Sequence, residues 1–234
     1  MNLGDFREDY QRGALDRAAL AANPLAQFES WFQAATGEQS QSRWRKIAIA
    51  LYKLWSAIRN HRPADINAMT LATVDPEGKP STRTVLLKSV DERGFVFFTN
   101  YESRKGRELA ENPHAALTFF WSDLERQVCV AGTVTKLPAP ESEAYFKSRP
   151  RGSQLAAWAS EQSAGVPDRA TLEARWREME TKFPKEIPRP PHWGGFILRP
   201  ERIEFWQGRP SRLHDRFCYS RQPDGAWQLE RLSP

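Results

Sequence analysis

The chain has 234 residues, a length that suits one large domain, or one domain with appendages, and argues against a repeat array. At this size most of the surface of the unfolded chain can be buried, so the fold needs no disulfide or metal to hold it together. The 34 Lys and Arg residues outnumber the 29 Asp and Glu residues and give a net charge of +5. This excess suits anionic ligands but is too small to indicate nucleic-acid binding without a clustered patch.

The two cysteines, Cys129 and Cys218, cannot form a disulfide framework, and no Cys/His cluster indicates a metal site. The N-terminus carries acidic residues and lacks the continuous apolar segment of a signal peptide. No stretch approaches the roughly 18 apolar residues that a membrane span needs. The sequence therefore predicts a cytoplasmic protein without a membrane span, in which both cysteines are reduced.

The N-terminal part of the chain has a helical pattern, which we assign to residues 5–36. Leu25, Phe28, Trp31 and Phe32 recur at three- and four-residue spacing after the helix start signal at Asn23-Pro24. We expect this apolar stripe to pack against the body of the protein, because such a face is stable only when it is covered.

From residue 67 the period changes to that of strands. Residues 68–74, 82–90 and 94–99 are β-branched and aromatic and are separated by turn signals, which predicts an antiparallel meander. Ser103 can cap a short helix that runs to about Asn112. Residues 115–121 and 127–137 return to strand character, and five strands of this kind favour a closed or partly closed barrel.

The last part of the chain is helical and then extended again. Helices are predicted over residues 140–148, 153–160 and 168–183, and strands over 195–198, 203–206, 216–220 and 226–232. Pro223-Asp224-Gly225 is a hairpin signal between the last two strands. Because strands lie both before and after these helices, we expect one sheet system and not two domains.

Four segments place cations where a strand-and-turn scaffold could direct them at an anion. They are residues 83–88 on a strand, 99–105 at a strand end that enters a helix, 145–153 at a helix end, and 203–216 beside two strands. A helix N-terminus offers free backbone N–H groups to a phosphate, and Arg forks and hydroxyls are good phosphate ligands. Each segment alone has an ordinary structural interpretation as well: a solvated helix start, exposed cations at a helix end, or a histidine that serves as a structural hydrogen-bonding group.

The last segment contains the most specific pattern, EFWQG (204–208) followed by RLHDR (212–216), which resembles the signature of the pyridoxamine 5′-phosphate oxidase family. These flavin enzymes make pyridoxal 5′-phosphate. The resemblance continues, in family order, through RTVLLK (83–88), FFTNYESRK (97–105), LERQV (124–128), YFKSRPRGSQ (145–154), WASEQS (158–163) and WGGF (193–196). It covers most of residues 63–234.

The resemblance implies a mainly β (α+β) fold, an FMN-binding split β-barrel of antiparallel strands with peripheral helices. It also implies an obligate homodimer with one FMN in each of two clefts between the subunits. The implied FMN contacts are Arg83, Thr84, Val85, Leu86, Leu87, Lys88, Phe98, Thr99, Arg104, Lys105, Gln127, Gln162, Ser163, Trp206 and Arg216. The implied substrate contacts are Arg7, Tyr10, Lys88, Tyr145, Arg149, Ser153, Arg212, Leu213 and His214, of which Arg212 and His214 would be catalytic.

The implied reaction oxidises pyridoxamine or pyridoxine 5′-phosphate to pyridoxal 5′-phosphate with dioxygen as the acceptor. It yields hydrogen peroxide and, from the amine, ammonia; apoenzymes that use pyridoxal phosphate are possible further partners. Two alternatives remain open: a split-barrel flavoprotein with another substrate or acceptor, and a carrier of pyridoxal phosphate or flavin without catalysis. Retention of Arg149, Ser153, Arg212 and His214 argues against the first, and turnover with oxygen would exclude the second.

Two departures from the family pattern concern the N-terminal part, which we separate as residues 1–62 from the split-barrel domain at 63–234. Arg7 and Tyr10 match a family motif that closes over the substrate, but Glu8 replaces a cation there. Residues 39–62 form an insert with the pattern of a basic amphipathic helix. Docking on its own dimer is the ordinary interpretation of such a helix, with a partner site or a membrane or nucleic-acid surface as alternatives.

Overall fold

The computed structural model of the chain describes residues 10–37 and 65–234. The expected substrate contact Arg7 and the predicted helix in residues 39–62 lie outside the described residues. The helices are η1 (Arg17–Ala19), α1 (Pro24–Thr36), α3 (Arg104–Glu111), η2 (Ser122–Leu124), α4 (Ala139–Ser148), α5 (Arg151–Ala159), α6 (Arg169–Lys182) and η3 (Pro210–Arg212). The strands are β1 (Ala68–Val74), β2 (Pro80–Leu86), β3 (Ser89–Asp91), β4 (Gly94–Asn100), β5 (His114–Trp121), β6 (Arg126–Lys136), β7 (Trp193–Gln207), β8 (Asp215–Arg221) and β9 (Trp227–Leu232).

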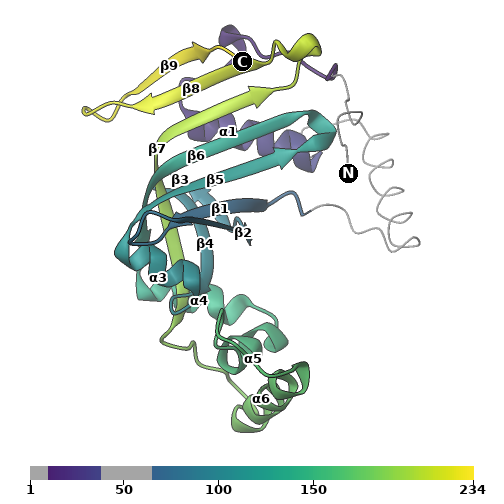
Figure 1. Cartoon of the computed structure of the whole chain (residues 1–234), viewed down its shortest axis with the longest axis vertical. Coiled ribbons are helices and arrows are strands. Elements are labelled where there is room, and N and C mark those ends of the chain that lie inside the picture. The colour runs from purple at the N-terminus through teal and green to yellow at the C-terminus, as the bar shows by residue number, and fades with distance from the viewer. Residues whose placement is uncertain (1–9, 38–64) are drawn as a thin grey trace. The chain divides into compact units, whose positions relative to one another are not determined.

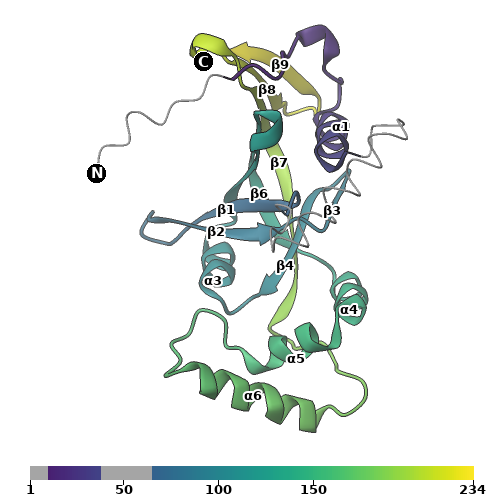
Figure 2. The same cartoon turned by 90° about the vertical axis from the view of Figure 1, so that its right-hand side faces the viewer.

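The chain divides into two compact units. The first, here called the terminal unit, comprises Met1–Thr70, Leu117–Ala131 and Pro200–Pro234; the second, the middle unit, comprises Leu71–Ala116 and Gly132–Arg199. Helices α3 to α6 belong to the middle unit, where α5 and α6 lie side by side (Figure 2). The terminal unit contains α1 and the hairpin of β8 and β9 (Figure 1).

The strands are hydrogen-bonded in the order β2-β1-β5-β6-β7-β4-β3, with β8 on β7 and β9 on β8. The predicted meander of the first strands is therefore wrong in one respect, because β4 pairs with β7 and β3 and not with β2. The reason is the composition of β4: Phe95, Val96 and Phe97 are all buried, so both faces of this strand are covered, as in the interior of a sheet.

Two boundaries also differ from the sequence prediction. Residues 82–90 are not one strand, since β2 ends at Leu86 and β3 begins at Ser89. Conversely, β7 is a single strand of 15 residues where two strands were expected. Pro200 lies within it, between Leu198, which pairs with β4, and Arg202, which pairs with β8. A proline cannot donate to a ladder, so it is tolerated where the pairing partner changes.

The N-terminal helix is shorter than the pattern predicted. Residues 10–16 are not helical, and α1 begins only at Pro24, where the Asn23 side chain accepts a hydrogen bond from the N–H of Leu25. Its apolar stripe packs as expected. Phe28 lies 5.0 Å from the ring of Phe119, and Trp31 meets Phe205 edge-on; both helix residues are buried.

The core of the middle unit forms around β4 and the adjoining part of β7. Phe97 is fully buried and its ring lies 5.7 Å from that of Phe196, which follows two glycines on β7. A second buried cluster joins the helices to the sheet through Phe146, Leu155 and Trp193. These contacts fix the end of β4 relative to α4 and α5. Among the described residues, no helix is both long and apolar enough to cross a membrane.

We expect Phe97→Ala to lower the free energy of unfolding by about 3 to 5 kcal/mol, because it removes a fully buried ring and leaves a cavity. Phe97→Leu keeps most of the buried volume and should cost less than about 1.5 kcal/mol. Denaturant titration of both variants at one protein concentration measures the difference. Equal losses of unfolding free energy in the two variants would mean that the core around Phe97 relaxes to fill the cavity, and that tight packing there does not hold β4 in place.

Candidate functional site

The middle unit contains a cavity of about 910 Å³, large enough for a sizeable ligand. Strands β2 and β4, the start of α3, and helices α4 and α5 contribute its walls. The lining residues are Ser81, Thr82, Arg83, Thr84, Val85, Leu86, Lys88, Phe98, Thr99, Asn100, Arg104, Lys105, Tyr145, Arg149, Pro150, Ser153, Ala156, Ala157, Ser160, Gln162, Ser163 and Trp193. Five of these described side chains are cationic and none is a carboxylate, so the cavity favours an anionic ligand.

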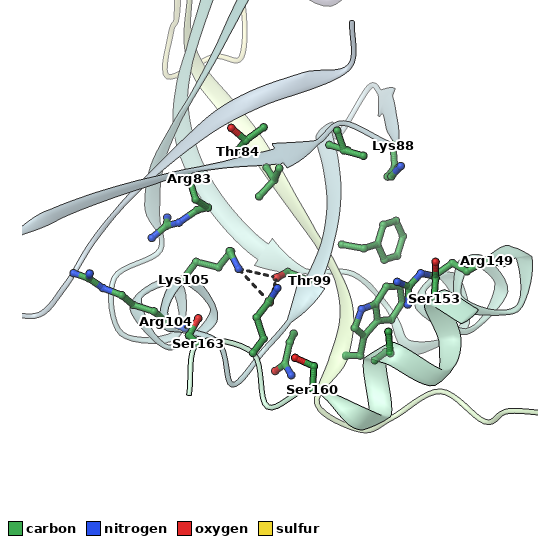
Figure 3. Close-up of a pocket in the computed structure, with 18 of the residues that line it drawn as sticks. Arg83, Thr84, Lys88, Thr99, Arg104, Lys105, Arg149, Ser153, Ser160 and Ser163 are labelled. Carbon is green, nitrogen blue, oxygen red and sulfur yellow. Dashed lines mark hydrogen bonds between the residues drawn. The ribbon is translucent and has the colours of Figure 1, made fainter. Parts of the chain in front are cut away.

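The cations form two groups. Figure 3 shows Arg83, Arg104 and Lys105 together near Ser163, while Lys88 and Arg149 lie on the other side of the cavity with Ser153. The alternation of β2 explains the first group, because Arg83 is half-buried while Thr82 and Thr84 beside it are exposed. A ligand with two separated anionic groups, or two ligands with one each, would match this arrangement.

Lys105 is the most buried of the five cations, with 8% of its surface exposed. It lies in the first turn of α3, whose N-terminus Ser103 caps by accepting from the N–H of Gly106. Its Nζ lies 3.2 Å from the hydroxyl of Thr99 and 3.2 Å from Oε1 of Gln162. Burial, and then the nearby Arg83, lower the pKa of Lys105 to about 8.

Gly106 allows this close approach of α3 to the end of β4. A Cβ atom at residue 106 would lie 2.2 Å from the carbonyl oxygen of Tyr101. The helix start therefore abuts the turn that follows β4. This proximity places Lys105 beside Thr99 at one end of the cavity.

Glu108 is a buried carboxylate behind the first cation group, and the sequence reasoning missed it. Its Oε1 accepts from Nε of Arg104 at 2.8 Å, and its Oε2 lies 3.2 Å from Nη2 of Arg83. Burial would raise the pKa of Glu108, but hydrogen bonds from Thr73, Ser81 and the two arginines outweigh it and lower the pKa to about 2. The i, i+4 spacing from Arg104 was a signal that could have identified this pair.

The second cation group combines one guanidinium with stacked aromatic rings. Phe98 stacks on Tyr145 with 3.9 Å between the ring centroids and on Trp193 with 5.4 Å. Arg149 lies over Trp193, with its Cζ 4.5 Å from the ring centroid. Nη1 of Arg149 is buried without a hydrogen-bond partner among the residues described, and burial lowers the pKa of this guanidinium. A buried donor of this kind calls for an acceptor, which an anionic ligand would supply.

The turn after α5 completes the first cation group. Ser163 has a left-handed backbone conformation (φ 77°), which is costly for a residue other than glycine. Its hydroxyl accepts from the backbone N–H of Arg104 at 3.2 Å, and the neighbouring Gln162 accepts from Thr99 at 3.1 Å. The turn is therefore held against the start of α3 by side-chain bonds.

A second cluster of predicted site residues lies in the terminal unit. The ring of Trp206 is 4.7 Å from that of His214, and Tyr10 packs edge-on against both. Nδ1 of His214 accepts from the backbone N–H of Arg209 at 3.1 Å, which assigns the proton of the neutral ring to Nε2. Burial, and then the charge of Arg212, lower the pKa of His214.

The loop that carries His214 is strained. Ser211 (φ 56°) and Arg212 (φ 61°) are consecutive residues in the left-handed region, and neither is a glycine. On the strand that follows, Nε of Arg216 donates to Glu204 at 2.8 Å. Leu213 is 71% exposed.

The structure thus divides the predicted site residues between two places. The middle-unit cavity is lined by Arg83, Thr84, Val85, Leu86, Lys88, Phe98, Thr99, Arg104, Lys105, Tyr145, Arg149, Ser153, Gln162 and Ser163. Leu87 is buried and does not line it. The terminal unit holds Tyr10, Gln127, Trp206, Arg212, Leu213, His214 and Arg216. Lining residues that the sequence did not single out as ligand contacts include Ser81, Asn100, Ser160 and Trp193.

Comparisons with known proteins agree on the family. Residues 58–183 match the family model "Pyridoxamine 5′-phosphate oxidase", and residues 193–234 match "Pyridoxine 5′-phosphate oxidase C-terminal dimerisation region". The chain is 57% identical over 233 residues to "Pyridoxine/pyridoxamine 5′-phosphate oxidase 1" of Ralstonia nicotianae, covering 100% of this chain and 99% of that protein. It is 52% identical to the corresponding oxidase of Paraburkholderia phymatum, with 99% of each chain covered.

Two solved structures are similar as well. PhzG from Burkholderia lata, determined in complex with tetrahydrophenazine-1-carboxylic acid, is 33% identical with a TM-score of 0.70, covering 80% of this chain and 92% of that one. A pyridoxamine 5′-phosphate oxidase-related, FMN-binding protein from Nostoc punctiforme is 22% identical with a TM-score of 0.61, covering 84% of this chain and 100% of that one. The second likeness concerns the fold alone.

The antiparallel sheet, its helices and these matches define a split-barrel oxidoreductase. The chain belongs to the pyridoxamine 5′-phosphate oxidase family. The fold class and the family expected from the sequence motifs are therefore confirmed.

We expect His214 to be neutral at pH 7 with its proton on Nε2, and to titrate below the ordinary histidine value of about 6.5, because burial and Arg212 both disfavour the imidazolium. Long-range ¹H–¹⁵N NMR spectra recorded against pH report both properties, and His214→Gln assigns the signal. A proton on Nδ1 at pH 7, or a titration midpoint above 6.5, would contradict this assignment.

Proposed function

We propose that the protein is an FMN-dependent oxidase that converts pyridoxamine 5′-phosphate and pyridoxine 5′-phosphate to pyridoxal 5′-phosphate. Dioxygen is the electron acceptor; hydrogen peroxide is formed, with ammonia from the amine. The observation that carries the proposal is the cavity of the middle unit, in which two separated cation groups face a ligand space without a carboxylate. FMN and the substrate each bring one phosphate, so together they supply the two anions that this arrangement needs.

The first cation group fits the phosphate of FMN. Lys105 supplies a buried charge, and Arg104 supplies a guanidinium whose Nη groups remain to face a ligand. Exposed β2 residues Thr84 and Leu86 would lie along the rest of the cofactor. When bound, FMN supplies a hydride acceptor, and the protein supplies position and electrostatics.

The second group fits the phosphate of the substrate. Arg149 presents a buried donor without a partner in the described structure, and Ser153 and Tyr145 add hydroxyls beside it. The aromatic rings behind them form a rigid wall that excludes water from one side. These groups hold the phosphate end, which leaves the C4′ end of the substrate to be oriented by other residues.

Arg212 and His214 are the proposed groups for that C4′ end, with Tyr10 beside them. A neutral His214 with its proton on Nε2 can donate one hydrogen bond, and the fork of Arg212 can hold an oxygen or position the ring. We assign these residues, with Gln127, Trp206 and Arg216, to a homodimer in which each site uses both subunits. The match of residues 193–234 to a dimerisation region supports this assignment.

A second candidate function is the oxidation of a different substrate on the same scaffold. The likeness to PhzG, whose structure holds a tetrahydrophenazine carboxylic acid, favours considering it. A phenazine carboxylate could also pair with Arg149, but it has two acceptor oxygens where a phosphate has three. The hydroxyls of Tyr145 and Ser153 beside Arg149 supply the further donors that a phosphate would use, and they support the phosphate substrate over this alternative.

Anaerobic addition of pyridoxamine 5′-phosphate to the purified flavoprotein tests the proposal directly. Loss of the oxidised-flavin absorbance, recovered on admission of oxygen, is the expected result. The same experiment with a tetrahydrophenazine carboxylic acid tests the alternative. A flavin that the B6 phosphate does not reduce would exclude the proposed oxidase and leave a carrier or another oxidoreductase.

Arg149→Ala should raise KM for pyridoxamine 5′-phosphate by about ten- to a hundredfold, because it removes a charge-assisted hydrogen bond to the phosphate. The phosphate is remote from the reacting carbon and binds alike in ground and transition states, so kcat should change less. Steady-state kinetics of the variant measures both. A fall in kcat with unchanged KM would place Arg149 at the reacting end instead.

Arg212→Lys is the matched comparison, since it keeps the charge and removes the planar fork. We expect it to slow flavin reduction in a single anaerobic turnover at saturating substrate, with normal FMN content, because the C4′ carbon is then misplaced. Reduction at the wild-type rate would remove Arg212 from the proposed positioning role.

FMN affinity should fall as pH rises above about 8, by up to about tenfold per pH unit, because Lys105 loses its proton there and a phosphate dianion binds the protonated amine. Below that pH the amine is charged and the affinity should be level down to about pH 7. Fluorescence titration of the apoprotein with FMN measures this. Lys105→Arg stays charged and should abolish the dependence; a variant with the same pH profile would contradict the assignment.

The same proposal places the protein in a reducing compartment such as the cytoplasm, which the two free cysteines support. Transfer of the product to apoenzymes that use pyridoxal phosphate stays a prediction from the sequence.

A further inference from the structure

Several residues of the family motifs contact neither the middle-unit cavity nor, in the proposal above, a ligand. Among them are Glu125 of LERQV, Gln207 of EFWQG and Asp215 of RLHDR. In the terminal unit these three residues meet at one place. All of them contact residues 10–15, an irregular segment here called the strap, which ends one residue before the N-cap of η1.

The strap is held through its backbone. The N–H of Arg12 donates to Oε2 of Glu125 at 2.8 Å, and the N–H of Leu15 donates to Oδ2 of Asp215 at 3.0 Å. The carbonyl of Gly13 accepts from Nη1 of Arg209 at 3.0 Å. An irregular segment has no ladder of its own, so these side chains satisfy the backbone groups that a helix or strand would have paired internally.

The two carboxylates are themselves fixed. Glu125 is buried, and its own carbonyl accepts from the N–H of Gly208 at 2.8 Å. Asp215 accepts from Arg231 at 2.8 Å; burial would raise its pKa, but the Leu15 N–H and Arg231 outweigh burial and lower it. Both anchors are therefore rigid acceptors at the ends of β6 and β8.

The strap begins at Tyr10, which packs edge-on against Trp206 at 5.4 Å and His214 at 5.7 Å. Gly208 makes this packing possible, because a Cβ atom there would lie 2.7 Å from Cβ of Tyr10. The position of Tyr10 relative to His214 thus depends on the bonds at residues 12–15.

We infer that Glu125 and Asp215 are positioning residues for the substrate site, which hold the strap so that Tyr10 stands against His214 and Trp206. The inference rests on the proposed function, because it takes Tyr10 and His214 as substrate contacts. The carboxylates act through Tyr10 and do not themselves touch substrate.

A double-mutant cycle on the full-length holoenzyme tests this coupling. Glu125→Ala and Tyr10→Ala should each raise KM for pyridoxamine 5′-phosphate by about tenfold, with FMN content unchanged. The double variant should show little more than either single effect, because both remove the same placement of the phenol. Asp123→Ala, an exposed carboxylate two residues from Glu125, is the matched control and should keep the wild-type KM. Effects that add in full would make Glu125 a general structural residue and overturn the inference.

A second measurement does not depend on turnover. Trypsin should cleave after Arg12 several times faster in Glu125→Ala and in Asp215→Asn than in the wild type or in Asp123→Ala, because a bound backbone resists proteolysis. Equal cleavage rates would overturn the inference even if the oxidase activity is confirmed. If cleavage accelerates as expected but the wild type does not oxidise the substrate, the two carboxylates still hold the strap and Tyr10 in place, and only the proposed function is wrong.

Discussion

Burial of positive charge is the constraint on which the candidate site depends. A cation removed from water is tolerated only when hydrogen bonds or an opposite charge compensate it. Nζ of Lys105 donates hydrogen bonds to the neutral oxygens of Thr99 and Gln162, and Arg83 forms an ion pair with the carboxylate of Glu108. These arrangements leave an unbalanced positive potential in a cavity with no carboxylate among its described lining residues. A phosphate that enters it gains from charges that hydrogen bonds within the protein hold in place.

Much of this arrangement was predictable from the sequence. Period-two patterns between turn signals predicted most of the strands, and the capping residue Ser103 predicted the start of α3. The predicted strand boundaries that proved wrong are those that depend on which strands pair in the folded sheet. No local signal distinguishes Pro200 as a residue inside one long strand, since the change of partner from β4 to β8 is a long-range event. The N-terminal helix was predicted to start too early, because the backbone of Arg12 and Leu15 is bonded to side chains distant in sequence, which no local pattern reveals.

The candidate site shows the same division. Motif residues that face the cavity could be named from the resemblance, but their supporting groups could not. Glu108 and Glu125 are buried carboxylates whose importance lies in which donors surround them, and such neighbourhoods are set by the fold. Equally, the sequence put the RLHDR motif and the RTVLLK motif in one list of ligand contacts. The structure assigns them to different units of the chain, linked through long strands such as β7.

The loop at Ser211 and Arg212 has a consequence for how the molecule handles flexibility. Two adjacent residues in the left-handed region lower the stability of the folded chain, and a relaxed loop could adopt many other conformations. The fold holds this loop in one strained conformation, so the entropy cost of ordering Arg212 is met during folding. Ligand binding then loses less conformational freedom. Under the proposed function, in which Arg212 contacts the substrate, stability of the fold and recognition of the ligand make opposite demands on the sequence of this loop.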